Sequence, residues 1–524
     1  MNPAADPGRE SGPAGAAPAT GSGPAREVPA ALAWSLVSKV LVSILAIASN
    51  VLIVRGLGDH AYGVYSIFLN IARFLSIVLG LGLAQGVLQF LPELRLRGNA
   101  RGSRQLLARA FLWQLAGWAV VVLAAFLLRG WLSRIQKADL HTLLPLGTAL
   151  LLFESLWATL SNVYTAVRRM AWLTIASVVE KAALVGLLIV LARGGVTPVH
   201  VLYVVAGSFL FGIALLAPGL PRLVPAGSGA DGAGMPAARL WRYAGPIVVG
   251  NLINQVLWRS SDTLFIGYYW NPTQVGYYNA AYNLAQMIIE FVPLAIWPVI
   301  LSSLSEAHVR RSDDLRRGTE LYFRLIFVLV VPFSLTGMVL GGQAYLAMYG
   351  AAMAPGAGLC QALFGILLIG FFVTPLRMAM FVKERTLANT LVLVAGAVVN
   401  VALNVLLIPR YGIGGAAISV GIALTLSGVV QYFVTRRVLP WAGVPWACFG
   451  KVLLASSLVV PLWFVRHSLH SPLPLAAALV GITLLQYLAL RQLRVFGEEE
   501  RELLHRSNLP LKPWLAWFLG ATRT

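Results

Sequence analysis

Two stretches of sequence decide the fold: ASNVLIVRGLGDHAYGVYSIFLNIA at residues 48–72 and SSDTLFIGYYWNPTQVGYYNAAYNLA at residues 260–285. They are two copies of one pattern. Identical residues recur at one constant offset, in the pairs Gly63 and Gly276, Tyr65 and Tyr278, Asn70 and Asn283, Ala72 and Ala285, and Glu93 and Glu306. In each copy Gly-x-Tyr restarts a helix after a tight turn, where glycine tolerates close packing or unusual backbone angles. The chain is therefore predicted to contain two related halves.

The sequence around both copies is apolar enough to lie in lipid. Hydrophobic residues make up 58% of the 524 residues and charged residues only 11%, whereas soluble domains carry about a quarter charged residues. A helix of about twenty apolar residues crosses the hydrocarbon core. The predicted fold class is an all-α polytopic membrane protein with about 14 transmembrane helices, the thirteenth interrupted by Pro461. They are placed at residues 31–54, 62–90, 105–128, 140–164, 172–191, 199–217, 241–268, 275–304, 321–340, 358–382, 387–408, 416–434, 452–465 and 474–490.

The charges between these helices orient the chain. Eighteen lysines and arginines fall in connections that share one side of the membrane, and seven fall in connections on the other side. An excess of Lys and Arg marks the cytoplasmic side, so both termini are predicted to be cytoplasmic. The net charge of +20 is spread over these short clusters. This distribution argues against nucleic acid as a partner.

The repeat also predicts the domain organisation. Because six helices separate the copies, both have the same orientation, and two parallel lobes should be related by an axis along the membrane normal, as in transporters. A duplicated scaffold without transport is the alternative. The predicted parts are a disordered cytoplasmic tail (1–29), the N-lobe with helices 1–6 (30–217), a cytoplasmic linker (218–238), the C-lobe with helices 7–12 (239–437), helices 13 and 14 (438–492) and a second cytoplasmic tail (493–524).

Three segments carry a family resemblance: residues 50–72, residues 259–285, and IPRYGIGGAAISVGIALTLSGVVQYFVTRR at residues 408–437. Through them the chain resembles the oligosaccharide flippases of polysaccharide biosynthesis, within the multidrug/oligosaccharidyl-lipid/polysaccharide flippase superfamily. The resemblance implies two six-helix lobes in a MATE-like arrangement, with alternating access to a central cavity. It implies a protein of the bacterial cytoplasmic (inner) membrane that moves an undecaprenyl-pyrophosphate-linked oligosaccharide to the periplasmic leaflet for cell-surface polysaccharide export. Lipid II flippases similarly carry two helices beyond twelve, which there accommodate a lipid tail.

Ionisable residues within the helices are candidates for the site, because charges at membrane depth are costly and face a cavity or a partner. A lipid-linked pyrophosphate needs fixed cations, and arginine supplies them with bidentate geometry. The candidate cavity cations are Arg73, Arg259 and Lys39. Two of them have alternatives: Lys39 could snorkel to the headgroups, and Arg259 could be neutralised by Asp262, three residues on.

Acidic residues within the helices are candidates for ion coupling or for structural hydrogen bonds. They are Asp262, Glu154, Glu290 and Glu180. Glu180 and Lys181 are adjacent and point about 100° apart on a helix, so the two are predicted not to pair with each other.

Two other classes of function compete with a flippase. A multidrug extrusion transporter of the same fold would need a cavity of carboxylates and aromatics, whereas the charges of helices 1, 2 and 7 are mostly basic. An enzyme is not expected, because the external loops are short and hold only Asp59 and Asp139 as obvious acids. No cofactor or metal is predicted. The expected partners are the lipid-linked oligosaccharide, membrane lipids, and a polysaccharide polymerase with other assembly proteins.

Overall fold

The computed structural model describes residues 24–80, 83–223, 261–310, 312–383, 385–469 and 471–496, with five single residues between 236 and 248. Within these ranges the secondary structure is helical and contains no strand. The predicted all-α class is therefore confirmed. Most of the two predicted tails, of the linker and of predicted helix 7 lies outside the described residues.

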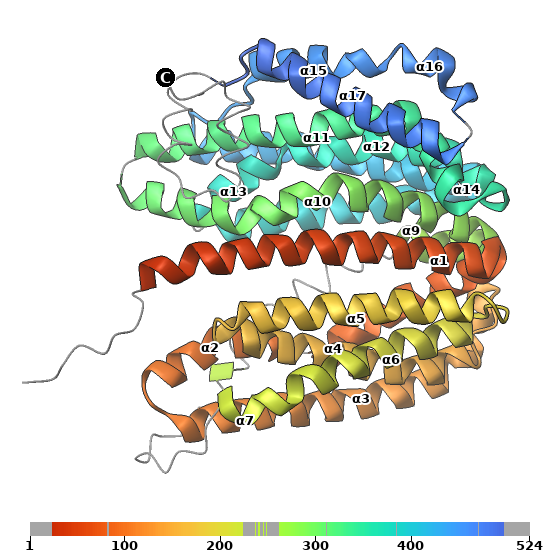
Figure 1. Ribbon diagram of the computed structural model, residues 1–524, viewed down its shortest axis with the longest axis vertical. Helices are drawn as coiled ribbons and strands as arrows, with labels where there is room; N and C mark the ends of the chain where they lie inside the picture. The colour runs from red at the N-terminus through yellow and green to blue at the C-terminus, as the bar shows by residue number, and fades with distance from the viewer. Residues whose placement is uncertain are drawn as a thin grey trace, which may run out of the picture.

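The N-lobe is built from the elements α1 to α7 (Figure 1). They are α1 (Pro24–Gly80), α2 (Leu83–Leu96), α3 (Ala100–Gln136), α4 (Leu143–Ala166), α5 (Met170–Leu191), α6 (Pro198–Leu216), a 3₁₀ turn (Ala217–Gly219) and α7 (Leu220–Leu223). As a straight helix α1 would be about 85 Å long. It breaks instead at Gly58, where φ is 73°. Gly58 lies in the turn of the first repeat copy, so α1 contains predicted helix 1 and most of predicted helix 2, whose end lies in α2.

The C-lobe follows the same plan and is covered by a terminal group of helices. Its elements are α9 (Ser261–Tyr269), α10 (Pro272–Arg310), α11 (Ser312–Tyr349), a 3₁₀ turn (Ala351–Gly356), α12 (Ala357–Phe372), α13 (Thr374–Val382) and α14 (Thr386–Val438). The terminal group is α15 (Trp446–Ser456), α16 (Leu462–Val465) and α17 (Pro472–Gln492), with 3₁₀ turns at Ser457–Val459 and Arg466–Ser468. α14 breaks at Gly412, where φ is 56°, so it contains predicted helices 11 and 12.

Prolines divide two predicted helices. Predicted helix 10 is split into α12 and α13 at Val373, with Pro375 in the first turn of α13; proline is tolerated there because it has no N–H to donate. Predicted helix 13 is also interrupted, as expected from Pro461. It begins earlier than predicted, at Trp446, and Pro461 directly precedes α16.

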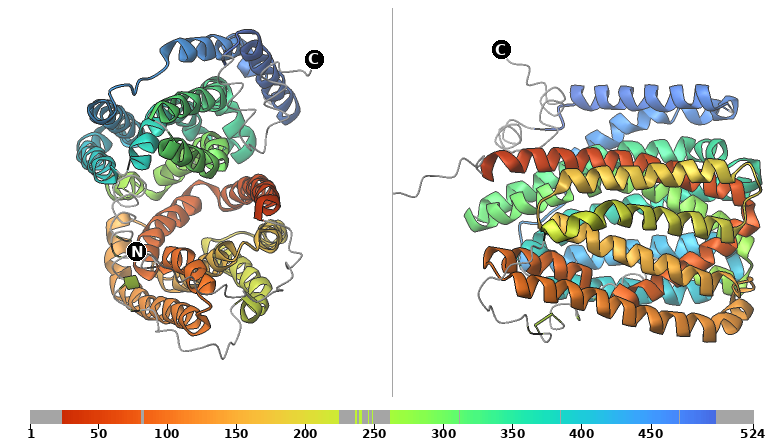
Figure 2. Two further views of the ribbon diagram at one scale, coloured as in Figure 1. Left: turned by 90° about the vertical axis from the view of Figure 1, so that its left-hand side faces the viewer. Right: turned by 60° about the horizontal axis from the view of Figure 1, so that its bottom comes forward.

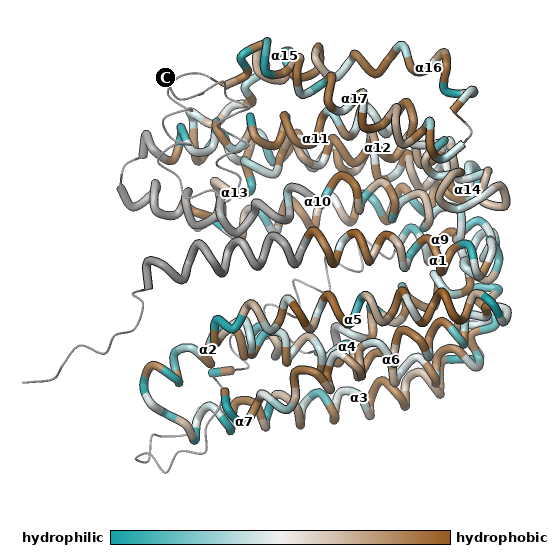
Figure 3. Tube along the Cα trace, in the orientation of Figure 1, coloured by the Kyte–Doolittle hydropathy of each residue, from teal (hydrophilic) through white to brown (hydrophobic). Residues whose placement is uncertain are grey.

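The outer surface suits lipid. Within the described residues, ten helical segments are long and apolar enough to cross a membrane by length and composition. Large apolar side chains are exposed on outward faces, among them Leu127 of α3 at 68% and Leu406 of α14 at 63%, which water would disfavour. The middles of the helices are hydrophobic and many of their ends are polar (Figure 3). The chain is thus a multi-pass membrane protein, and the number of fourteen crossings stays a prediction.

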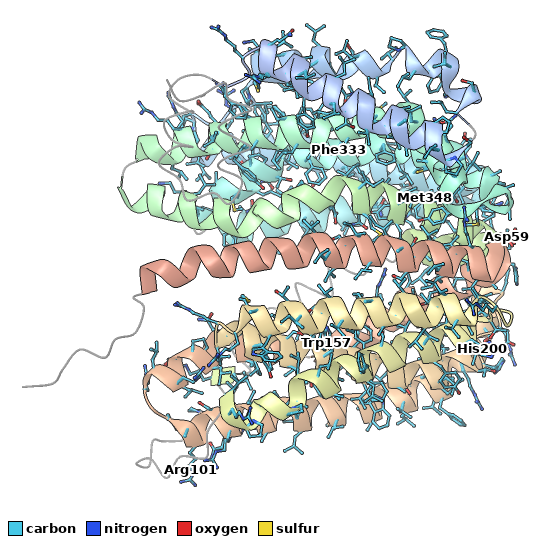
Figure 4. All side chains as sticks on the ribbon, in the orientation of Figure 1. Asp59, Arg101, Trp157, His200, Phe333 and Met348 are labelled. Atoms are coloured by element: carbon cyan, nitrogen blue, oxygen red, sulfur yellow. The ribbon has the colours of Figure 1, made fainter. Side chains whose placement is uncertain are left out.

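The lobes form two groups when viewed along the helices (Figure 2, left), with α15 and α17 packed on α11 of the C-lobe. Figure 4 labels residues at both ends of the helices. Asp59, His200 and Met348 lie towards one end, here called the Asp59 end. Arg101 lies at the opposite end, here called the Arg101 end.

The two repeat copies meet at the Asp59 end. Here α1 packs against α10. A Cβ atom on Gly63 would overlap the backbone carbonyl of Pro272, and a Cβ on Gly276 would lie 2.5 Å from the backbone oxygen of Asp59. Residues close to a two-fold axis contact their own equivalents, as these two glycines do. Of the two roles expected for the glycine of Gly-x-Tyr, close packing is the one observed.

Gly63→Ala should push the lobes apart at this end, because the blocking atoms belong to backbone and cannot rotate away. Spin labels on cysteines placed at the exposed positions His200 and Arg410 would report the separation. Both native cysteines, Cys360 and Cys448, are buried. We expect a longer mean distance in Gly63→Ala than in the parent.

Gly207→Ala is the matched control, since a Cβ on Gly207 meets nothing within 4 Å. Its distance distribution should equal that of the parent. Equal distributions for Gly63→Ala and Gly207→Ala would show that the glycine contact does not hold the lobes together.

Candidate functional site

A cavity of about 370 Å³ lies between the lobes. The N-lobe lines it with α1, α4, α5 and α6, and the C-lobe lines it with α10. Its polar lining residues are Ser49, Asn50, Tyr62, Tyr65, Ser66, Asn70, Arg73, Glu154, Lys181, Asn279, Asn283 and Gln286. A polar cavity inside an apolar bundle is the feature expected where a membrane protein handles a hydrophilic group.

Three ionisable side chains line the cavity: Arg73 from α1, Glu154 from α4 and Lys181 from α5. Arg73 and Glu154 are exposed although they lie within long helices, because they face this space. Both Arg73 and Lys181 interact electrostatically with Glu154. Within the described lining, Arg73 and Lys181 stand against the carboxylate of Glu154 on the N-lobe side, and Lys181 is paired in addition with Glu180 behind the lining.

Glu180 and Lys181 form an ion pair, so the prediction that they do not pair is wrong. Lys181 Nζ lies 3.2 Å from Glu180 Oε1, and Ser208 Oγ of α6 donates to the same oxygen at 2.9 Å. The Glu180 side chain is 1% exposed. A buried carboxylate has no water to solvate it and needs another partner. The long side chain of Lys181 supplies one by bending back towards Glu180, although the two residues point in different directions on the helix. Glu180 therefore ties α5 to α6.

The C-lobe side of the cavity is lined mainly by amides. Asn279, Asn283 and Gln286 of α10 face the space. Gln286 Nε2 donates to Glu290 Oε1 at 2.8 Å, one turn further along the helix. Glu290 is thus held beside the cavity by a hydrogen bond within α10.

An arginine joins the two lobes at the Asp59 end. Arg55 of α1 donates from Nε to the carbonyl of Met348 at 2.6 Å and from Nη2 to that of Ala347 at 2.5 Å. These are carbonyls of the last turn of α11, which lack helical partners. The partial negative charge of a helix C-terminus favours a cation there. Arg55 therefore joins the N-lobe to the C-lobe at this end.

Further hydrogen bonds between the lobes surround Arg55 and the two glycines. They are Tyr277 Oη to Asp59 Oδ2 (3.0 Å), Tyr349 Oη to Asn50 Oδ1 (2.6 Å), His60 Nδ1 with Thr273 Oγ1 (3.3 Å), and Lys137 Nζ to the carbonyls of Tyr269 (3.2 Å) and Trp270 (3.1 Å). Together with the backbone contact they join the two lobes at the Asp59 end.

Asp262 lies within the C-lobe, away from the cavity lining. Its side chain accepts hydrogen bonds from Tyr278 of α10 (2.7 Å) and from two amides of α14, Asn404 (2.6 Å) and Asn400 (3.0 Å). Asp262 is 2% exposed. A buried carboxylate is stable when several donors surround it, so Asp262 joins α9, α10 and α14.

The structure brings only part of the predicted set together. Arg73 and Glu154 share the cavity, whereas Glu180, Glu290 and Asp262 bind neighbouring side chains. Arg259 lies outside the described residues, as does the side chain of Lys39. Sequence reasoning missed Lys181 and the amides of α10. The amides had a signal, because residues 279, 283 and 286 share one helix face and Asn283 belongs to the repeat.

Two lobes around a central cavity define the class: a multi-pass membrane protein with the fold of the flippases and transporters of the MOP superfamily. The chain has a TM-score of 0.69 to "Lipid II flippase MurJ, inward closed conformation", covering 86% of this chain and 97% of that one at 12% identity. The TM-score is 0.62 to "Inward-facing conformation of a multidrug resistance MATE family transporter of the MOP superfamily", covering 78% and 98% at 14% identity. These likenesses show the fold.

The chain belongs to the polysaccharide biosynthesis protein family, whose model matches residues 30–304. It is 22% identical over 427 residues to "Putative O-antigen transporter" of Shigella flexneri, covering 77% of this chain and 96% of that protein. It is 24% identical over 258 residues to "Probable flippase AglR" of Haloferax volcanii. That second match spans 47% of this chain and 53% of AglR, about half the length of each.

Asp262→Ala should destabilise the C-lobe, because it leaves Tyr278 and two buried amides without their shared acceptor. We expect a loss of about 2–4 kcal/mol, visible as a lower melting temperature of the purified protein in detergent. Asp139→Asn is the control, since Asp139 is exposed and, within the described part of the chain, its side chain bonds only the backbone N–H of His141. Equal melting temperatures for both variants would contradict the anchoring role.

Proposed function

We propose that this protein is a flippase that moves an undecaprenyl-pyrophosphate-linked oligosaccharide from the cytoplasmic to the periplasmic leaflet by alternating access. The observation that carries the proposal is the cavity between the lobes, whose lining combines the cations Arg73 and Lys181 with many neutral polar groups. A headgroup of this kind has two matching parts, an anionic pyrophosphate and a hydroxyl-rich glycan. The family and the names of the two sequence relatives support the proposal.

The pyrophosphate requires cations that are already in place, because water is scarce inside the bundle and charges there are strengthened by the low dielectric. Arg73 offers a planar fork that can bind two phosphate oxygens. Lys181 is a second cation on the same side of the cavity, where it also pairs with Glu180. Arg259 and Lys39, predicted from the sequence, remain part of the proposed cation set.

Alternating access would begin from the arrangement described here, with the lobes joined at the Asp59 end. Opening that end requires Arg55 to leave the α11 carbonyls and the two glycines to separate. These contacts are short but few, so binding of a headgroup to both lobes could offset their loss. The cavity would then face the opposite leaflet.

The orientation follows from the loop charges. We assign the Arg101 end, which carries most of the basic connections, to the cytoplasm, and the Asp59 end to the periplasm. Both termini are then cytoplasmic and the protein resides in the bacterial inner membrane. The flipped lipid would pass to a polysaccharide polymerase and other assembly proteins.

A multidrug transporter of the same fold is less well supported. Cationic drugs would need carboxylates, and Glu154 is the only carboxylate among the described lining residues, where it interacts with two cations. The same arrangement suggests a different role for Glu154. An arriving pyrophosphate would repel its carboxylate, and uptake of a proton removes the repulsion. We therefore assign ion coupling to Glu154, and structural roles to Glu180, Glu290 and Asp262.

Deletion of the gene should cause the lipid-linked oligosaccharide to accumulate on the inner leaflet and abolish surface polysaccharide. Arg73→Gln should fail to restore export, because the pyrophosphate loses its bidentate partner, while Arg73→Lys should restore it in part. Lipid extracts and surface polysaccharide would be measured at matched protein levels.

Arg410→Gln is the control, because Arg410 is an exposed arginine at the Asp59 end, outside the cavity. It should restore export fully. Normal export with no accumulated intermediate in the deletion strain would refute the flippase proposal.

Glu154→Gln should uncouple flipping from the pH gradient. In proteoliposomes, the parent should flip faster when a proton gradient is imposed, while the variant should flip at one rate with or without the gradient. Equal stimulation of parent and variant would exclude Glu154 as the coupling residue.

A further inference from the structure

The amides of α10 form a polar stripe on one face of the helix. Asn279, Asn283 and Gln286 follow one another at intervals of four and three residues, which places them on the same side. All three line the cavity. α10 contributes one more lining residue, the apolar Met287.

The repeat supplies the counterpart of this stripe on the N-lobe. The offset that relates Gly63 to Gly276 also relates Ser66 to Asn279, Asn70 to Asn283 and Arg73 to Gln286. These six residues all line the one cavity. Two equivalent helix faces therefore look onto the same space from opposite lobes.

The two faces differ in charge at one pair. Arg73 on the N-lobe stands where the C-lobe has the neutral Gln286. Glu154 and Lys181, the other ionisable lining residues, also belong to the N-lobe. Among the described residues, the cavity thus has a charged wall and an amide wall.

An amide suits a sugar better than a phosphate. Each side-chain amide offers two donor hydrogens and an acceptor oxygen, and each sugar hydroxyl likewise donates and accepts. A pyrophosphate only accepts, so it leaves the amide oxygens unused and gains more from the cations opposite.

We propose that the amide stripe of α10 binds the glycan of the lipid-linked substrate, while the charged wall of the N-lobe binds its pyrophosphate. The inference rests on the proposed flippase function and assigns an orientation to the headgroup within the cavity. The stripe then determines how strongly the glycan contributes to binding.

The present hydrogen bonds of the stripe fit this role. Asn279 is 8% exposed and is engaged by Thr263 at 3.2 Å and by the Val275 carbonyl at 3.1 Å, so it serves as the fixed base of the stripe. Asn283 makes a long bond of 3.4 Å to Tyr62 Oη on the other lobe. A bond of that length is weaker than the usual 2.9–3.0 Å, so a sugar hydroxyl can replace it.

Replacement of the Asn283–Tyr62 hydrogen bond would couple glycan binding to movement of the lobes. The bond from Asn283 to Tyr62 joins the two lobes. A glycan hydroxyl that accepts a hydrogen bond from Asn283 would replace Tyr62 as its partner, and one contact between the lobes would be lost. Gln286, fixed by Glu290, keeps its orientation while this happens.

The test compares two ligands on the purified full-length protein in nanodiscs. One is undecaprenyl pyrophosphate, and the other is the oligosaccharide-bearing lipid purified from the deletion strain. The parent should bind the second ligand more tightly.

Two variants remove one amide each. Gln286→Met and Asn283→Leu keep the approximate size of the side chain and remove its hydrogen-bonding groups. Each variant should lower the affinity for the oligosaccharide-bearing ligand about tenfold, which is the effect of one lost hydrogen bond of typical strength. The affinity for undecaprenyl pyrophosphate should stay unchanged.

Two reference variants make the result specific. Gln274→Met makes the same chemical change on α10 outside the cavity and should alter neither affinity. Arg73→Gln should lower the affinity for both ligands. If Gln286→Met and Asn283→Leu lower the affinities for both ligands equally, or lower neither affinity, the glycan assignment is wrong while the flippase proposal stands. If the parent binds neither ligand, the flippase proposal itself fails.

Discussion

The close approach of Gly63 and Gly276 is the constraint on which the rest of the structure depends. Neither backbone leaves room for a side chain on the other helix, so α1 and α10 are held together at the Asp59 end. From that contact the two helices run along opposite sides of one space, and their inward faces become the walls of the cavity. Arg55, Asp59 and Tyr349 then add hydrogen bonds around the same contact. A single pair of small residues thus fixes where the lobes touch.

Charges inside the bundle fall into two groups with different consequences. Asp262 and Glu180 are almost fully buried, and hydrogen-bond donors from neighbouring helices surround them. Such groups hold helices in register, since separating the helices would leave a carboxylate without partners. Arg73 and Glu154 face the cavity instead, where a mobile ligand or water can reach them. The polar contacts of the buried carboxylates of Asp262 and Glu180 therefore lie within the lobes and not between them.

The sequence predicted the class, the repeat and the approximate positions of most helices, because long apolar runs and a constant offset depend on local composition alone. It predicted Arg73 at the cavity because a cation in a long apolar helix has few other places to face. It could not predict that Glu180 pairs with Lys181, since that depends on Ser208 and Phe209 of the next helix closing around them. The cavity amides were also missed, because an asparagine looks the same whether it faces a ligand or a neighbouring helix.

The bonds from Arg55 to α11 end on main-chain oxygens, and this has an evolutionary consequence. Any residue except one that disturbs the helix can stand at positions 347 and 348 and still present those carbonyls. Related sequences are therefore free to drift there without a compensating change at position 55. Methods that find contacts from correlated substitutions would overlook the contact between Arg55 and α11, although its two hydrogen bonds are among the shortest that connect the lobes.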